Sequence, residues 1–304
     1  MSAPGAGFSV ATVDDADALA AAYAVRSTVF VGEQQVPPAL ERDALDTLSR
    51  HVIARDADGR AIGTGRLGPD GRIGRLAVLA GWRGRGVGDA LLRALLELAD
   101  AAALRTTTLH AQLAAMDLYA RHGFVAHGPV FDEAGIAHRA MRRVDGAGFA
   151  VDDLDAAIDV SVTLVQSARR HLWLRSRDLD PGLFDRPEVL RAFRRFATAG
   201  RGGVVQVLLQ DASAPQREHA PLLALAQRLP SAFAFRAVDD AVDRSFAGAF
   251  LVNDNGGFLV RALGHRFDGE AATRQPGQAR QLAMQFAPVW ERSRPCTEFR
   301  ALGI

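Results

Sequence analysis

The stretch Arg83-Gly84-Arg85-Gly86-Val87-Gly88 decides how the first half of this chain is interpreted. An apolar run from Ile73 to Leu79 precedes it, with the length and the bounding glycines of a β-strand. After it, leucines recur at helical spacing through Ala99, so the glycines fall where a helix begins. The sequence therefore predicts a strand, a tight turn and a helix in that order.

A glycine-rich turn at a helix start is a suitable place for an anion. The first turn of a helix presents up to four backbone N–H groups without intrahelical partners and carries roughly half a positive elementary charge. Phosphate oxygens are favoured there. Gly84, Gly86 and Gly88 lack the Cβ atoms that would hold a ligand away from the backbone. The alternative, on this hexamer alone, is a turn that binds nothing.

Two other phosphate-binding loops are excluded by their spacing. The Rossmann fingerprint needs Gly-x-Gly-x-x-Gly, and the P-loop ends in Gly-Lys-Ser/Thr. The chain contains no lysine, so all 36 Lys+Arg residues are arginine. The lack of lysine also excludes a lysine Schiff base and a lysine nucleophile.

Length and charge limit the classes of function. The 304 residues suffice for two domains of ordinary size, each with its own core. The formal net charge is +1, made of −1 before Gly148 and +2 after it. Because neither half is strongly basic, charge suggests no nucleic-acid partner and no membrane-surface partner.

Cysteine content and the N-terminus predict a cytoplasmic protein. Cys296 is the only cysteine, cannot form an internal disulfide and so fits a reducing compartment. It follows a proline near the C-terminus, which favours a structural role over a catalytic one. Asp14, Asp15 and Asp17 stand where a secretion signal would need apolar residues, and no run approaches about 18 apolar residues. We expect no membrane partner and no metal site.

The first half shows the pattern of a mixed sheet with flanking helices, and so an α/β fold. Its expected elements are a helix over 14–30, a loop over 31–40, strands over 51–55, 61–67 and 73–79, a helix from the glycine loop to 99, a strand over 106–110, a helix over 114–121 and a hairpin of 124–131 with 136–141.

Several motifs follow one another in this half. They are V-F-V-G-E-Q (Val29 to Gln34), Asp43, His51, G-R-L-A-V (Gly74 to Val78), the glycine hexamer, A-Q (Ala111 and Gln112), L-Y-A-R-H-G-F (Leu118 to Phe124) and E-A-G-I-A-H-R-A-M (Glu133 to Met141). This succession resembles the GNAT superfamily of N-acetyltransferases, in particular its ElaA-like branch. The resemblance covers about residues 8 to 144.

The resemblance implies acetyl-CoA as the cosubstrate. In GNAT enzymes the backbone of the strand before the loop pairs with the pantetheine arm, and the loop holds the pyrophosphate. The matching positions are Leu76, Ala77 and Val78 for the pantetheine and Arg83, Gly84, Arg85, Gly86, Val87 and Gly88 for the pyrophosphate. Arg83 matches the basic residue that opens the loop, where the main chain usually matters more than the side chain. Gln112 is a candidate for the pantetheine amide, or else it orients a strand end.

The resemblance also implies a catalytic acid. Tyr119, in the segment that ends in Gly-Phe, matches the position that in many members protonates the departing CoA thiolate. A thiol with a pKa near 8.5 leaves more readily when an O–H group stabilises its thiolate, and a positioned acid contributes roughly 10²–10⁴ in rate. The alternative for Tyr119 is a packing aromatic on its helix.

The catalytic base cannot be carried over from the family. Many GNAT enzymes place a Glu on the strand before the loop, but this chain has Ile73-Gly74-Arg75 there. The resemblance leaves as candidates Glu33, Asp43, His51, Glu133 and His138, of which Glu33 and His51 are put forward for the catalytic site. For each histidine the alternative is a half-buried residue with its hydrogen bonds satisfied. If Glu33, Asp43 and Glu133 surround the acceptor, we expect the acceptor to carry a positive charge at a position other than the reacting amine.

A glycine-containing hinge at Asp145 to Gly148 separates a first domain, residues 1–148, from a second, residues 149–304. The second domain is expected to contain helices over 152–169, 188–198, 219–228 and 278–292 and strands over 171–176, 204–210, 232–238 and 249–254. Asn255-Gly256 predicts a hairpin turn. Alternating strands and helices indicate an α/β domain with a mostly parallel sheet.

The second domain is similar to a degenerate single lobe of the phospholipase D-like fold. Catalysis in that family needs a His-x-Lys pair, and Gly264-His265-Arg266 is the nearest sequence here. We therefore expect no phosphodiesterase activity. The domain is interpreted as a binding, docking or dimerising module, which leaves a homodimer open.

Two functions from different classes are consistent with these features. The first is an N-acyltransferase that moves an acetyl group from acetyl-CoA to a primary amine of a small molecule by direct attack, with Tyr119 as general acid. The alternative is a non-catalytic acyl-CoA-binding regulator whose C-terminal domain carries the output. The presence of Tyr119 favours the first, and the missing strand carboxylate leaves room for the second.

Overall fold

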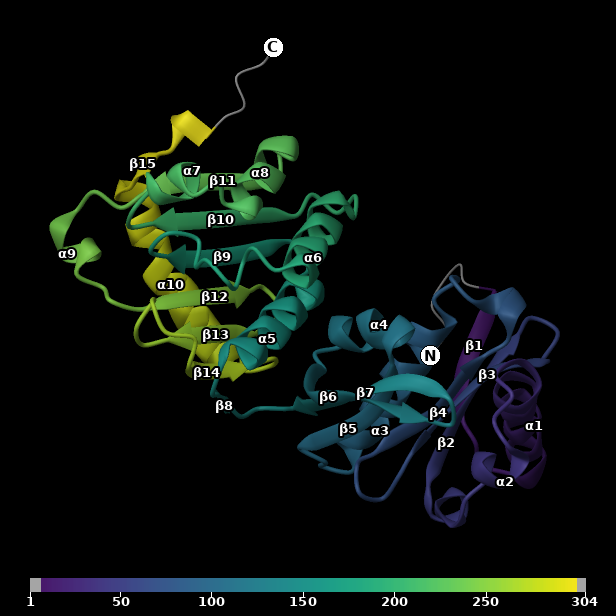
Figure 1. Cartoon of the computed structure of the whole chain (residues 1–304). Coiled ribbons are helices and arrows are strands. Elements are labelled where there is room, and N and C mark those ends of the chain that lie inside the picture. Colours follow the sequence, from purple (N-terminus) through teal and green to yellow (C-terminus); the bar gives the residue numbers. More distant parts are fainter. Residues whose placement is uncertain (1–6, 300–304) are drawn as a thin grey trace. The chain divides into compact units, whose positions relative to one another are not determined.

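The computed structural model describes residues 7–299, and the chain forms two compact α/β units (Figure 1). Among the described residues, the first unit contains 7–118 together with Gly128–Arg142. The second contains Tyr119–His127 and residues 143–299. The predicted α/β class is confirmed.

The glycine loop lies, in chain order, between the last strand of one short sheet and the first strand of another. A four-stranded antiparallel sheet has the order β1 (Phe8–Thr12), β2 (Arg50–Asp56), β3 (Ala61–Leu67) and β4 (Ile73–Val78). A three-stranded sheet has the order β5 (Thr106–Gln112), β7 (Ile136–Val144) and β6 (Val125–Glu133). The loop follows β4, after the 3₁₀ turn η3 (Ala80–Trp82), and leads into α3 (Val87–Ala101).

Helix α3 packs closely on one face of the four-stranded sheet because β3 carries glycines there. A Cβ atom on Gly63 would lie 2.9 Å from Leu91 Cδ1, and one on Gly65 would lie 2.8 Å from Leu95 Cδ1. Both leucines are fully buried. The two glycines therefore set the distance between the helix that follows the loop and the sheet that precedes it.

The predicted helix over 14–30 is interrupted. Helix α1 (Ala16–Arg26), capped by the Asp15 side chain, continues as a π-helical segment, η1 (Ser27–Glu33), in which Gln34 N donates to Val29 O at 3.0 Å. The region predicted as a loop over 31–40 contains the end of this segment and most of α2 (Pro38–Glu41), and η2 (Ala44–Leu48) follows. Single π-helical turns are rare and occur often at functional sites.

The segment Tyr119–His127 belongs to the second unit although it lies within the first half of the sequence. It contains the end of α4 (Met116–Arg121), which follows the turn η4 (Leu113–Ala115), and the start of β6. Thr163 Oγ1 donates to Phe124 O at 2.9 Å. Val125 is part of the hydrophobic core of the second unit.

The second unit is built on one eight-stranded sheet. Its order is β15 (Arg294–Pro295), β11 (Phe233–Ala237), β10 (Val204–Leu209), β9 (His171–Ser176), β12 (Ala249–Asn253), β13 (Phe258–Arg261), β14 (Gly269–Ala272) and β8 (Phe149–Val151). The sheet is mixed rather than mostly parallel, because only β9, β10 and β11 run parallel to one another. The other five pairings are antiparallel.

Connection length accounts for the parallel pairs and for the hairpin of β12 and β13, whereas the antiparallel pairs β9–β12, β14–β8 and β11–β15 join strands distant in sequence. Parallel neighbours need a crossover of a dozen or more residues, whereas antiparallel neighbours need only a turn. Helix α6 (Pro187–Thr198) connects β9 to β10, and α7 (Ala214–Arg217) and α8 (Pro221–Arg228) connect β10 to β11. Strands β12 and β13 are joined by the predicted Asn255-Gly256 turn, in which Gly256 has a φ of +91°.

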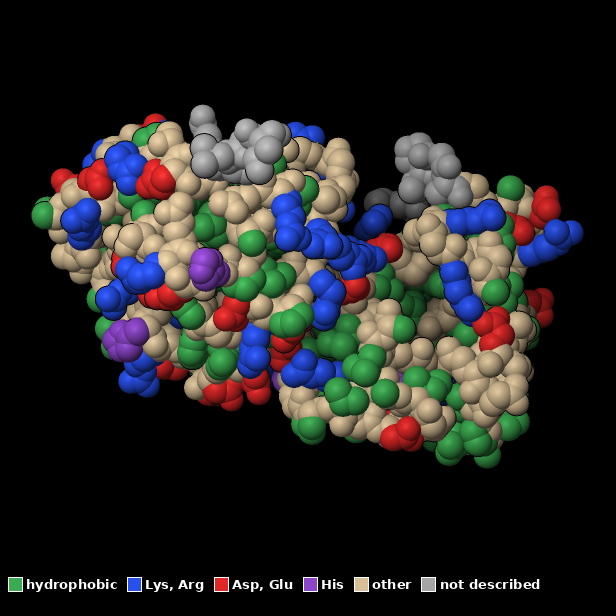
Figure 2. Space-filling model, turned by 45° about the horizontal axis from the view of Figure 1, so that its top comes forward, with side chains coloured by type: hydrophobic (Ala, Val, Ile, Leu, Met, Phe, Trp, Pro, Cys, Tyr) green, Lys and Arg blue, Asp and Glu red, His purple; other side chains and the backbone are tan. Residues whose placement is uncertain are grey.

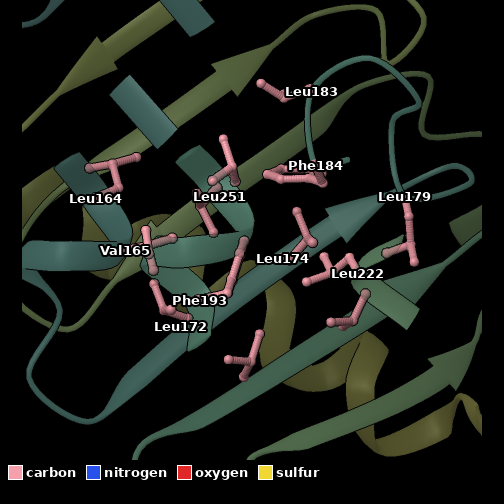
Figure 3. Close-up of a cluster of buried hydrophobic side chains, with 14 of the residues drawn as sticks. Leu164, Val165, Leu172, Leu174, Leu179, Leu183, Phe184, Phe193, Leu222 and Leu251 are labelled. Atoms are coloured by element: carbon pink, nitrogen blue, oxygen red, sulfur yellow. The ribbon is translucent and has the colours of Figure 1, made fainter. Parts of the chain in front are cut away.

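Helices cover both faces of this sheet (Figure 1). Helices α5 (Leu154–Ser167), α6 and α8 pack on one face, and α10 (Pro276–Arg292) packs on the other. Figure 3 shows Leu164 and Phe193 in the cluster with Leu172, Leu174 and Leu251 of the sheet. The short helix α9 (Ala241–Arg244) lies between β11 and β12 in the chain, and the 3₁₀ turn η5 (Thr297–Phe299) follows β15.

Charged side chains of both signs are interspersed on the face shown in Figure 2, in keeping with the formal net charge of +1. Among residues 7–299, no helix combines the length and the apolar composition needed to cross a membrane.

Candidate functional site

The glycine loop has the backbone geometry of an open helix start. Gly84 and Gly86 have φ angles of +74° and +84°, and Gly86 is the N-cap of α3. No side chain of the described residues caps this helix start. A Cβ atom on Gly84 or Gly86 would meet no atom of the described chain within 4 Å. The glycines are therefore required by the left-handed backbone, and the space that a side chain at either position would fill is empty in the described chain.

The side chain of Arg83 holds the start of this loop. Its Nε donates to Val78 O at 2.9 Å, and its Nη2 pairs with Glu33 Oε2 at 2.5 Å. Arg83 therefore ties the end of β4 to the end of the π-helical segment. Arg85 lies over the ring of Trp82, 5.1 Å from its centroid.

Strand β4 has one edge outside any ladder. Ala77 and Val78 pair with Thr64 and Gly63 of β3 on one side. On the other side, β5 meets the chain at the parallel bridge between Arg72 and Thr108, just before β4 begins. Beyond this bridge β4 and β5 belong to different sheets, and no ladder of the described residues covers the outer edge of Leu76, Ala77 and Val78.

Helix α4 lies against the start of α3. A Cβ atom on Gly88 would be 3.5 Å from Leu118 Cδ2. Tyr119 follows Leu118 in the same helix; its side chain is buried, with its ring edge-on to Phe124 at 6.1 Å. Burial raises the pKa of Tyr119 to about 12. Its phenol therefore keeps its proton at neutral pH, as a general acid must.

The two catalytic candidates Glu33 and His51 belong to separate clusters. Glu33 is the ion-pair partner of Arg83. His51 is buried, and its Nε2 lies 2.9 Å from Asp46 O, so this nitrogen donates to the carbonyl. Its Nδ1 has no hydrogen-bond partner within the described part of the chain. His51 therefore differs from the half-buried, fully hydrogen-bonded histidine that was the alternative, because it is buried and only one of its ring nitrogens is paired.

His51 borders a buried network of ion pairs that the sequence did not predict. Arg26 is fully buried and donates to Glu41 and, at 2.6 Å, to Asp46 Oδ1. The other members are Arg66, which donates to Asp43 and Asp46 at 2.7 Å, and Arg75, which donates to Asp43 Oδ2 at 3.1 Å. Three arginines thus balance three carboxylates, which is the condition for burying charge without a large penalty.

The network removes Asp43 from the candidates for the base. Burial alone would raise the pKa of Asp46, but hydrogen bonds from Arg26 and Arg66 outweigh it and hold this pKa well below its ordinary value. The hydrogen bond from Arg66 likewise lowers the pKa of Asp43. Both carboxylates stay charged and hydrogen-bonded at neutral pH, so neither is suited to take up a proton.

Two polar pairs lie on the exposed face of β5, where side chains alternate with the buried Leu109 and Ala111. Gln112 Nε2 donates to Gln34 Oε1 at 3.0 Å. His110 Nδ1 lies 2.7 Å from Glu133 Oε2. The sequence analysis named Gln112 and Glu133 but missed His110. The alternation in T-T-T-L-H-A-Q could have found it, because it places His110 on the same face as Gln112.

Glu133 and His138 differ in their surroundings. Burial alone would raise the pKa of Glu133, but the hydrogen bond with His110 outweighs it and lowers this pKa. His138 is nearly buried, with Nδ1 2.8 Å from Ile136 O and its ring stacked on Phe131 at 6.1 Å. Glu133 is thus an accessible carboxylate, whereas the ring of His138 is largely buried against Phe131.

The described residues favour neither a metal-binding site nor a catalytic cysteine. Within residues 7–299, no group of three or more His, Cys, Asp or Glu side chains is placed to hold a metal ion. Cys296 is buried, and burial raises the pKa of its thiol to about 12. The thiolate needed for nucleophilic attack is therefore disfavoured.

Comparison with known proteins identifies the first half. Residues 14–144 match the family described as Acetyltransferase (GNAT) domain. An uncharacterized N-acetyltransferase of Bacillus subtilis, YjcF, is 35% identical over 126 residues, which cover 40% of this chain and 89% of the relative. The chain belongs to the GNAT acetyltransferase family. It is accordingly an acyltransferase that uses an acyl-CoA, and GNAT acetyltransferases act on amines of small molecules or proteins.

Other similar proteins cover the same GNAT segment. The uncharacterized protein YyaT of Bacillus subtilis is 30% identical over 128 residues, or 40% of this chain and 86% of the relative. Among solved structures, an acyl-CoA N-acyltransferase from Pseudomonas aeruginosa is 32% identical with a TM-score of 0.41, covering 45% of this chain and 99% of that one. Escherichia coli ElaA is 26% identical with a TM-score of 0.41, covering 45% and 99%.

The remainder of this GNAT protein matches a different family. Residues 153–302 match the domain of unknown function DUF7931. The comparisons do not support the phospholipase D-like resemblance that the sequence suggested. The match assigns no activity to the second unit.

Proposed function

We propose that the protein transfers an acetyl group from acetyl-CoA to a primary amine of a small molecule by direct attack. The observation that carries the proposal is the start of α3, where Gly84 and Gly86 have left-handed backbones, no described side chain caps the helix, and the space beside both glycines is empty. Such a helix start binds phosphate oxygens through its N–H groups and its dipole. The pyrophosphate of coenzyme A is the anion assigned to this loop.

The pantetheine arm is assigned to the free edge of β4. Ala77 and Val78 pair with β3 on one side, and β4 is an edge strand of its sheet, so the other edge of Leu76, Ala77 and Val78 is available to an extended amide chain. Backbone pairing of this kind gives affinity without dependence on side chains. Gln112, on the facing strand β5, is assigned to the amides of the same arm.

Tyr119 is proposed as the general acid. As the C–S bond of the tetrahedral intermediate breaks, its phenol gives a proton to the departing thiolate. Burial, which raises the pKa of Tyr119 to about 12, means only that the phenol is protonated when the step begins.

A comparison of Tyr119→Phe with Tyr23→Phe tests this role. The chain contains 2 tyrosines, and Tyr23 lies beside the buried ion network, under Arg26 and Arg42, which makes it a matched control. Thiol release from acetyl-CoA is measured with a panel of amines, and coenzyme A affinity by calorimetry. We expect kcat to fall roughly 10²–10⁴-fold in Tyr119→Phe with unchanged affinity, and little change in kcat in Tyr23→Phe.

The same panel tests the acetyl donor and the acceptor. Acetyl-CoA is compared with longer acyl-CoA esters, and small amines with a peptide that carries a free N-terminus. The sequence suggested a cationic acceptor on the basis of three carboxylates, but Glu33 and Asp43 are paired with arginines. We therefore expect neutral and polyamine-like acceptors to differ little. Coenzyme A binding without turnover on any amine would contradict the proposal.

We propose no reaction for the second unit. Its role as a binding or dimerising module is tested by light scattering of the full chain, in which a mass of twice 32.5 kDa would indicate a homodimer.

A further inference from the structure

Three polar side chains from three segments converge on the exposed face of β5. His110 Nδ1 lies 2.7 Å from Glu133 Oε2 of β6 and 2.9 Å from Arg72 Nη2, which precedes β4. One ring nitrogen cannot donate to a carboxylate and accept from a guanidinium at the same time. An ionised carboxylate can only accept, so the shorter contact, from Nδ1 to Glu133 at 2.7 Å, requires the proton on Nδ1. This tautomer leaves Nε2 of His110 with a lone pair.

The strand register places His110 beside the thioester end of the proposed pantetheine path. The parallel bridge pairs Arg72 with Thr108, so two residues further along, Gly74 is level with His110. The pyrophosphate loop follows the end of β4, and a pantetheine arm that runs back along this strand brings its thioester towards Gly74. Here Arg75 has a φ of +53°, in the segment where the pairing of β4 with β3 shifts register.

The other positions that could have supplied a base hold an arginine, a carboxylate paired with an arginine and a buried histidine. Arg75, where the family often has a carboxylate, donates to Glu41 O, Leu40 O and Asp43. Glu33 is paired with Arg83, and His51 is buried. By contrast, the side chains of His110 and Glu133 are 36% and 44% exposed, so an acceptor can reach them.

We propose that His110, oriented by Glu133, is the general base that deprotonates the acceptor amine, an assignment that rests on the proposed acetyl transfer. The charged groups around it are Glu133 on β6, Arg72 before β4 and, across the ring of Phe131, His138 on β7. The carboxylate accepts from Nδ1–H and so fixes the orientation of the ring and its tautomer. This leaves Nε2 as the nitrogen that can accept a proton.

The proton balance of the step is complete. The acceptor ammonium gives one proton to His110 Nε2, and the lone pair of the neutral amine forms the C–N bond with the thioester carbon. When the C–S bond breaks, the thiolate takes a proton from Tyr119, and the second proton lost from the nitrogen returns to that phenolate through solvent. The imidazolium releases its proton to water. The products are the amide, coenzyme A as the thiol and one proton.

The test compares His110→Gln and Glu133→Gln with His265→Gln, a control at an exposed histidine of the second unit. Two acceptors are used, one amine that is mostly protonated at pH 7 and one whose low pKa leaves it neutral. We expect kcat/KM of His110→Gln to fall about 10²-fold or more with the protonated amine. The loss should be much smaller with the neutral amine, and it should shrink as the pH approaches the pKa of the protonated one. Coenzyme A affinity should not change.

Each outcome bears on the assignment. Glu133→Gln should give a smaller loss with the same dependence on the amine, because the imidazole remains. Equal losses of His110→Gln with both amines at every pH would indicate a structural role and overturn the proposal, as would wild-type activity. A wild-type protein that binds coenzyme A but acetylates no amine would instead overturn the proposed function, and the assignment of His110 with it.

Discussion

At the scale of single residues, Arg26 is the most deeply buried member of the ion network in the first unit. It is fully buried and holds Glu41 and Asp46, which are also buried. Replacement by methionine leaves both carboxylates without this partner, and such a change typically costs about 3–5 kcal/mol. We expect the free energy of unfolding in urea to fall by that amount.

The exposed Arg42 supplies the control for this prediction. It lies 3.9 Å from Glu41 with its side chain 64% exposed, so Arg42→Met should change the unfolding free energy by less than about 1 kcal/mol. Equal effects of the two substitutions would mean that burial of the network contributes nothing.

The same network predicts how stability depends on pH. The pKa values of Asp43 and Asp46 are lowered in the folded protein. A lowered folded-state pKa means that the unfolded chain binds protons first as the pH falls. The contribution to stability is therefore present above the unfolded value of about 3.9 and is lost as the pH falls below it towards the folded values.

Urea unfolding between pH 6 and pH 3 measures this dependence. Asp46→Asn should lower stability at pH 6 and flatten the loss at low pH, because the titrating group is gone. Asp58→Asn, at a turn where the side chain is 71% exposed, is the control. A variant at position 46 that loses stability as steeply as the wild type would contradict the role of this carboxylate.

At the scale of elements, two glycines of the same unit serve different purposes. Gly65 leaves room for α3, since a Cβ atom there would lie 2.8 Å from Leu95 Cδ1 and 3.0 Å from Leu76 Cδ1. Gly86 has open space around it but a φ of +84°. We expect Gly65→Ala to destabilise the fold by about 1–3 kcal/mol through overpacking, with little effect on coenzyme A affinity in the folded protein.

Gly86→Ala should weaken coenzyme A binding strongly while destabilising the fold only slightly. The left-handed backbone costs a non-glycine residue about 1–2 kcal/mol, and any shift away from it turns the first-turn N–H groups away from the pyrophosphate. Coenzyme A affinity should fall more than tenfold, measured by calorimetry, while thermal unfolding shifts by only a few degrees. Unchanged affinity would remove the loop from the binding site.

Local patterns were sufficient to predict most elements. The strands over 61–67 and 171–176 agree with β3 and β9 because apolar residues bounded by turn formers define them. The Asn255-Gly256 hairpin followed from its turn chemistry. The π-helical segment could not be predicted, because it differs from an α-helix in hydrogen bonds that reach one residue further along the chain, which a short apolar pattern does not reveal. The mixed sheet order depends on long-range pairing, which local periodicity does not encode.

The candidate site was predictable only in part, for a similar reason. The glycine loop is contiguous in sequence, so its residues, and the free edge of the preceding strand, could be named from the motif. The partners of Asp43 and Glu133 are not contiguous with them. Arg66 lies 23 residues from Asp43, and His110 lies 23 residues from Glu133. Nothing in the spacing of these residues indicates that they pair, so the ion network and the pairing of His110 with Glu133 emerged only from the fold.

At the scale of the whole molecule, the second unit contains the segment that begins with the proposed acid. Tyr119–His127 belongs to this unit, and its backbone is held there by the hydrogen bond from Thr163 Oγ1 to Phe124 O. Thr163 is nearly fully buried. Stability of the C-terminal sheet and its helices is thereby linked to the position of Tyr119, although the family match that defines the enzyme ends at residue 144.

Thr163→Val tests this link in the full chain. The substitution keeps the shape of the side chain but leaves a buried carbonyl without its donor, which costs about 1–3 kcal/mol. We expect kcat to fall while coenzyme A affinity, set by the loop of residues 83–88, stays the same. Thr198→Val is the matched control, because this hydroxyl donates to Arg194 O at 2.9 Å on an exposed part of α6. If Thr163→Val unfolds more easily yet turns over at the wild-type rate, the second unit does not support the position of Tyr119.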